Sequence, residues 1–138
     1  MHLPLPLVEA LDGQLNLCVQ LEEIADSLPD RVDRQLCLEV ARSVVLSTKH
    51  FHDVEDRLVF QQLLDADSSR GAWIEELRLE RAADEYKAEE VQQELQALAE
   101  GQSKLAPEAI GYLLRGFFDG SRRHVRHCRE LLRVAHGA

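Results

Sequence analysis

The sequence predicts an all-α protein, an antiparallel up-down-up-down four-helix bundle. Leu, Ala, Glu, Gln and Arg, all good helix formers, dominate the 138 residues, whereas aromatic residues make up 5%. The signals of strands, sustained alternation of apolar and polar residues or Asn-Gly hairpins, are absent from the sequence. Helix-breaking residues are few and grouped, so they divide the chain into four long segments. A chain of this length is expected to form one domain, residues 1–138.

The breakers set the expected limits of each helix. Pro29 ends the first helix, and Asp30 can cap the second. The second is long enough for a bend or a non-helical start. A turn at residues 67–71 separates it from the third, and Pro107 lies in the first turn of the fourth. The connections are short, which favours antiparallel neighbours. The expected helices run, in order, over about Pro6–Leu28, Arg31–Asp65, Ala72–Ala99 and Pro107–Ala135.

Each expected helix carries an inward stripe at three- and four-residue steps, and in the last three helices ionisable residues interrupt it. Antiparallel geometry at ~1.5 Å per residue brings these interruptions to one depth. Burying an unpaired charge is costly, so the groups are expected to meet in an interior polar cluster. The residues at this depth are His52, Asp56, Arg81, Glu85 and His124.

Imidazoles and carboxylates that converge from several helices form a metal-ligand arrangement. Two histidines with two carboxylates could hold zinc, iron or manganese. Arg81 opposes such a site, because a guanidinium is always charged and offers no lone pair. It is expected to fill the site and to pair with the carboxylates, Asp84 among them. The candidate ligands are His52, Asp56, Glu85 and His124, with Glu55, Cys128 and Glu130 as further candidates.

Cys128 lies one helical turn after His124 on the same inward face. A thiolate–imidazole pair at this place would be a redox sensor or a ligand for a soft metal. A neutral buried thiol would instead act as a small apolar side chain, which is the commoner fate of a free cysteine. The apolar role is therefore expected.

Charge and hydropathy exclude several classes of protein. The net charge of −9 argues against a binder of nucleic acid or of anionic membranes. No apolar run approaches the length that crosses a bilayer, and the N-terminal residues lack the pattern of a signal peptide. Three cysteines at unrelated spacings fit reduced thiols and a cytoplasmic protein. The acidic third helix and the basic fourth helix are expected to complement one another as neighbours.

Three segments resemble the hemerythrin-like (HHE cation-binding) family. Residues 50–64 resemble its second-helix motif, His-x-x-x-Glu followed by Leu-Phe-Pro. Residues 77–85 resemble its third-helix motif, and residues 111–125 resemble the fourth helix of a bacterial branch. The resemblance covers nearly the whole chain. It implies a bundle whose interior binds two non-haem irons, bridged by carboxylates, that sense or carry oxygen or handle related oxidants.

The chain departs from the family pattern at the implied ligands. The first helix should offer a histidine near Leu11 or Gln14 but has none. Arg81 stands where the third helix should carry a histidine, and Cys128 stands where the fourth helix usually carries a glutamate. The second helix keeps a histidine with the shorter Asp56, and its exit has Gln61 in place of proline.

These departures favour a degenerate di-iron site in a non-catalytic regulatory or protein-interaction module. No cofactor is favoured, and the expected partner is an unidentified protein or a second copy of the chain. The alternative is a metal-binding oxygen or oxidant sensor with a reduced ligand set, which would use non-haem iron, zinc or another transition metal. An enzyme is the least favoured class, because iron redox chemistry needs a full ligand shell and an open position.

Overall fold

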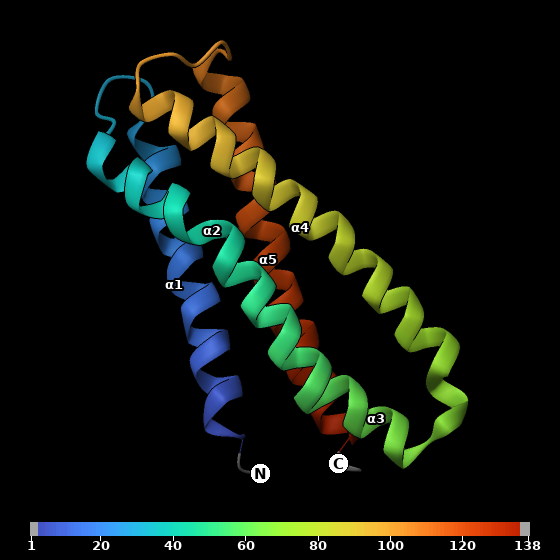
Figure 1. Ribbon diagram of the computed structural model, residues 1–138. Coiled ribbons are helices and arrows are strands. Elements are labelled where there is room, and N and C mark those ends of the chain that lie inside the picture. Colours follow the sequence, from blue (N-terminus) through green and yellow to red (C-terminus); the bar gives the residue numbers. More distant parts are fainter. Residues whose placement is uncertain (1–2, 136–138) are drawn as a thin grey trace.

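A computed structural model, which describes residues 3–135, confirms the all-helical antiparallel bundle (Figure 1). The second helix of the bundle is one continuous rod made of α2, η1 and α3, in which η1 is a single π-helical turn. No helix among the described residues combines the length and hydropathy that crossing a bilayer requires. The elements are α1 (Leu5–Ser27), α2 (Arg34–Glu55), η1 (Asp56–Phe60), α3 (Gln61–Ala66), the 3₁₀ turn η2 (Ser68–Arg70), α4 (Gly71–Ala99) and α5 (Pro107–Ala135).

The second rod begins three residues later than the sequence suggested. Asp33 caps it in place of the expected Asp30, because the Asp33 carboxylate accepts a hydrogen bond from the Leu36 amide at 3.1 Å. The sequence predicted a bend or a non-helical start for this helix; residues 31–33 are not helical, and the rod contains the π-helical turn η1. A π turn admits one extra residue, which resets the buried face. Glu55 and Phe60, five residues apart, are consequently both buried.

The interior consists of two apolar clusters with a polar layer between them. One cluster includes Leu21 and Leu114, and the other includes Phe51 and Leu131. Every helix of the bundle contributes to both clusters and breaks its apolar stripe between them. The buried polar residues of the described chain are Gln14, Thr48, His52, Glu55 and Arg81.

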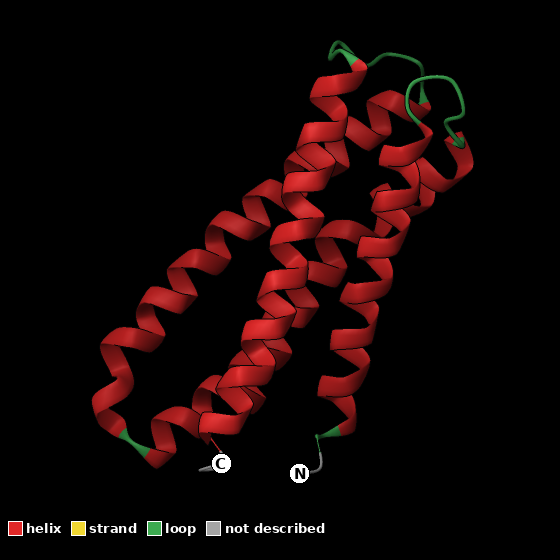
Figure 2. Cartoon of the chain, turned by 180° about the vertical axis from the view of Figure 1, so that it is seen from behind, coloured by secondary structure: helices red, strands yellow, loops and turns green. Residues whose placement is uncertain are grey.

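The helices are not packed equally against one another. α2 packs mainly against α4, and α1 against α2 and α5, whereas α4 and α5 touch little. Figures 1 and 2 show the N-terminal half of α4 diverging from the other helices. The expected charge complementarity between α4 and α5 is therefore wrong for most of their length. Arg115 and Arg122 of α5 instead bind Asp26 and Glu22 of α1 at 2.8 and 3.1 Å.

Candidate functional site

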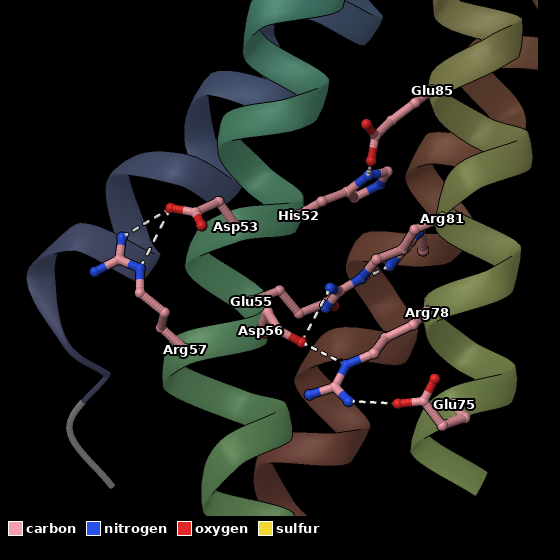
Figure 3. A network of polar contacts seen from close by, with 10 residues as sticks. His52, Asp53, Glu55, Asp56, Arg57, Glu75, Arg78, Arg81 and Glu85 are labelled. Atoms are coloured by element: carbon pink, nitrogen blue, oxygen red, sulfur yellow. Dashed lines mark hydrogen bonds and ion pairs between the residues drawn. The ribbon is translucent and has the colours of Figure 1, made fainter. Parts of the chain in front are cut away.

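The polar layer is centred on an ion pair between α4 and α2. Arg81 donates from Nε and Nη2 to Oε1 of Glu55 at 3.2 and 2.9 Å. Its guanidinium carbon lies 3.8 Å from the centroid of the Phe60 ring, a cation–π contact. Arg81 is 6% exposed and Glu55 is 0% exposed. The arginine thus brings a permanent positive charge into the interior of the bundle (Figure 3).

Asp56 faces arginines of α4 and not the histidines. Its Oδ1 accepts hydrogen bonds from Arg78 Nε at 2.9 Å and from Arg81 Nη1 at 3.4 Å. Arg78 also donates to Glu75 at 2.6 Å, which extends the network to the surface (Figure 3). Asp56, which the sequence offered as a metal ligand, is thus engaged as a counter-ion.

Two imidazoles lie on the other side of Glu55, each held by a carboxylate of α4. His52 Nδ1 is 2.9 Å from Glu85 Oε2, and His124 Nδ1 is 3.3 Å from Asp84 Oδ2. His124 Nε2 also lies 3.0 Å from Glu55 Oε1, the oxygen that binds Arg81. The two rings stack with centroids 5.3 Å apart. The structure therefore brings His52, Glu85 and His124 together, with Glu55, a further candidate from the sequence, at the centre.

The two histidines carry different charges. Burial lowers the pKa of His52, and the hydrogen bond to Glu85 only partly offsets this effect. Burial acts in the same direction on His124, but Asp84 and Glu55 outweigh it and raise its pKa to about 9. The pKa of Glu55 is lowered, because His124 and Arg81 together outweigh the effect of burial. At neutral pH a neutral His52 thus stacks on a protonated His124, and Glu55 is ionised between His124 and Arg81.

The remaining thiol and acidic candidates, Cys128 and Glu130, form no ion pair with Arg81 or with the two histidines. Cys128 is 0% exposed, and burial together with the negative charge of Glu55 raises the pKa of its thiol. It is a neutral, buried side chain at physiological pH, which agrees with the expected apolar role. Glu130 is exposed and binds Arg133 at 3.3 Å, so the structure does not bring it to the cluster.

Helix α1 contributes an amide where the family resemblance called for a histidine. Gln14 donates from Nε2 to Thr48 Oγ1 at 3.1 Å and accepts from Ser47 Oγ at 2.9 Å. The amide is 2% exposed and ties α1 to α2. This contact was not predicted from the sequence. Two uncharged polar residues at the same depth on neighbouring stripes were the signal for this contact.

Within residues 3–135, one group of side chains has the geometry to hold a metal ion. One ligand atom each from His52, Asp84 and His124 lie within 4.8 Å of one another. Asp84, which the sequence offered as a partner for Arg81, takes the place expected for Asp56. The inward stripe of the third helix passes between Asp84 and its neighbour Glu85, so the sequence alone could not separate their roles.

The family model described as the hemerythrin HHE cation-binding domain matches residues 12–132. The chain belongs to this family. Among curated proteins and solved structures, none gives a significant match. The match confirms the family that the three sequence segments suggested. Because the family model is described as cation-binding, the next question is whether the residues of this chain can hold a cation.

The donor set of this hemerythrin domain does not fit a pair of metal ions. Arg81 places a guanidinium against Glu55 inside the bundle, and the α1 position is an amide already engaged by Thr48 and Ser47. A single ion would find the three ligand atoms of the His52 group. Oε2 of Glu55 is buried and forms no hydrogen bond with any described residue, so it is an acceptor still open to a cation or a water.

Proposed function

We propose that this hemerythrin-fold domain is a non-catalytic regulatory or interaction module in which Arg81 supplies the positive charge that a dinuclear metal centre would provide. The observation that carries the proposal is the buried contact of Arg81 with Glu55 Oε1, at 2.9 Å. All four carboxylates at the layer, Glu55, Asp56, Asp84 and Glu85, already have a protein partner there. A bundle whose buried carboxylates are all paired with protein groups acts as a rigid scaffold for a protein partner or for a second copy of the chain.

The protonation of His124 supports the same proposal. A metal ligand must be a neutral imidazole, and the pKa of His124 is raised to about 9 by Asp84 and Glu55 after the opposing effect of burial. An ion that binds at neutral pH must therefore displace a tightly held proton. At about 1.4 kcal/mol per pKa unit, this displacement costs an ion on the order of 3 kcal/mol at pH 7.

A second function is favoured by the convergence of His52, Asp84 and His124. In that case the domain would be a metal-binding oxygen or oxidant sensor with a reduced ligand set. His52 and His124 would supply nitrogen ligands and Asp84 an oxygen ligand, a set that suits iron or zinc. Bound iron would supply the redox chemistry, and the protein would keep the site buried and hold the ligands through Glu85 and Glu55.

Metal analysis of the protein purified without chelator separates the two functions. We expect well below one equivalent of any transition metal, and no absorption from an oxo-bridged iron pair. The proposal would be overturned if the parent protein contained near one equivalent of a transition metal. That metal would have to be lost in His52→Ala and His124→Ala and retained in the exposed control Glu130→Gln. That result would establish the metal-binding function in its place.

A further inference from the structure

A cleft of about 520 Å³ lies between α4 and α5, on the side where these helices diverge. Its volume is within the range of small-molecule sites, about 300–1,000 Å³. The side chains on its floor are apolar and largely buried: Phe60, Leu77, Phe117 and Leu131. The cleft also reaches His124 and Asp84, so it connects solvent with the edge of the polar layer. A concave, partly apolar wall with a few polar groups is the usual form of a ligand site.

Two cationic side chains that line the cleft have no ion-pair partner among residues 3–135. Neither Lys87 of α4 nor Arg123 of α5 forms an ion pair or a side-chain hydrogen bond with any residue that the structure describes. The negative charge of Asp84 is already met by His124 at 3.3 Å, which leaves Glu80 as the other acidic group on the wall. Glu80 lies seven residues from Lys87 along α4, about 10 Å away along the helix axis. One end of the cleft is therefore left with a surplus of positive charge.

At the same end of the cleft, glycines of α5 expose their backbone on the wall. Gly116 and Gly120, one turn apart on α5, both line the cleft. A Cβ atom added at Gly116 would meet nothing within 4 Å, and one added at Gly120 would meet only Arg123 Nη2, at 3.8 Å. Glycine weakens a helix interior relative to alanine, and nothing packed against these two positions requires its small size. The space beside them is open to a molecule from outside the chain.

We propose that this cleft binds an elongated organic anion. Lys87 and Arg123 hold an oxyanion head group beside the exposed backbone of Gly116 and Gly120. The apolar body lies along the floor toward Leu77, ten residues from Lys87 on α4, a span of about 15 Å. This length suits an extended chain of about ten carbons. The site is separate from the Arg81–Glu55 pair, because neither of these two residues lines the cleft.

Decanoate is the first probe, with decyl phosphate to distinguish a carboxylate from a phosphate head group. Binding is measured by calorimetry and by amide chemical shifts, on protein freed of metal with a chelator so that the head group cannot bind through an ion. We expect saturable binding of at least one of the two anions, with shifts centred on Gly116, Gly120 and Ser121. Decan-1-ol, which lacks the charge, is expected to bind at least tenfold more weakly. Equal binding of the alcohol, or no saturable binding of either anion below about 5 mM, overturns the proposal.

Matched variants locate the site. Gly116→Leu fills the cleft while improving helix propensity, so it should fold and weaken binding by at least tenfold. Gly13→Leu is the control, because Gly13 is an exposed glycine of α1 whose added Cβ also meets nothing within 4 Å. Arg123→Gln should weaken the binding of the anions but not of the alcohol. Arg126 is an exposed arginine of α5 outside the cleft, so Arg126→Gln should change the binding of neither. Unchanged affinity in Gly116→Leu would show that the anion binds elsewhere and overturn the assignment.

Discussion

Arg81 binds Glu55 through two nitrogen atoms, and the side chains of the two residues are 8% and 0% exposed. Each of the other arginine–carboxylate pairs in the described chain has at least one partner that is more than a third exposed. Taking two charges out of water costs several kcal/mol per ion, so this pair persists only because further contacts complete it. Phe60 covers the guanidinium, and His124 supplies a second cation to Glu55.

Replacing Arg81 with alanine should therefore strongly destabilise the fold. Glu55 would stay buried with only His124 as counter-charge, and breaking a buried pair by removing one partner costs about 3–5 kcal/mol. Urea unfolding followed by circular dichroism measures the change. The control is Arg57→Ala, which removes an exposed pair with Asp53 at 3.2 Å and should cost less than about 1 kcal/mol. A loss below about 0.5 kcal/mol for Arg81→Ala would be the size of a surface change and would contradict this account.

Stability should also depend on pH through His124. Its pKa is raised to about 9 by Asp84 and Glu55, against the effect of burial, so the folded state holds this proton more tightly than the unfolded state. The stabilisation is fully present below the ordinary histidine pKa of about 6.5. It is lost as the pH rises from there through 9. The expected loss is roughly 3 kcal/mol.

The measurement compares the free energy of unfolding of the parent and of His124→Gln between pH 6 and 9 in chelator-treated protein. His52 and Cys128 are present in both proteins, so the comparison isolates the effect of replacing His124 and its contacts. We expect the advantage of the parent to shrink steadily above pH 6.5. A difference that stays constant, or grows, across this range would show that Asp84 and Glu55 do not hold His124 protonated.

The polar layer could be predicted from the sequence, because the helical period determines which residues face the interior of the bundle. His52, Arg81 and His124 each fall on an inward stripe, and a charge on such a stripe must find a partner inside the bundle. The stripe also placed Gln14 on the inner face of α1. Depth along each helix follows from counting residues, so the convergence of these positions needed no side-chain detail.

The pairing within the layer could not be predicted in the same way. Which carboxylate meets which cation depends on side-chain rotamers and on the π turn at residues 56–60, which rotates the following residues by an extra position. Asp56 was expected beside the histidines and instead meets Arg78 and Arg81. Asp84 was expected beside Arg81 and instead meets His124. Neighbouring acids on one helix cannot be told apart by period alone.

The divergence of α4 from α5 also had no signature in the sequence. An acidic helix followed by a basic one suggests a complementary pair, but Arg115 and Arg122 of α5 bind Asp26 and Glu22 of α1 instead. Spacing between helices depends on how the whole set of side chains packs, which no single stripe encodes. The cleft that Lys87 and Arg123 line is a consequence of this packing.

If the polar layer is a metal centre that has lost its ligands, substitutions that restore ligands should restore part of its metal binding. Gln14 of α1 binds Thr48, one turn before His52 on α2. The two helices are antiparallel, so the residue one turn before Gln14, Leu11, lies level with His52. Leu11 is 1% exposed, and its side chain points into the core. A histidine there would add an imidazole at the depth of the layer.

The double change Leu11→His with Arg81→His supplies two imidazoles and removes the cation that binds Glu55. Glu55 Oε1 would then be free of the guanidinium, and Oε2 already lacks a hydrogen bond within the described residues. We expect the double variant to retain iron through gel filtration, whereas the parent and Leu11→His alone do not, because the charge of Arg81 repels a cation in both. Added metal should raise its midpoint of thermal unfolding, since a ligand that binds only the folded state stabilises it. A double variant that is folded by circular dichroism but retains no more iron than the parent would show that Leu11 and Arg81 do not share the depth assigned to them.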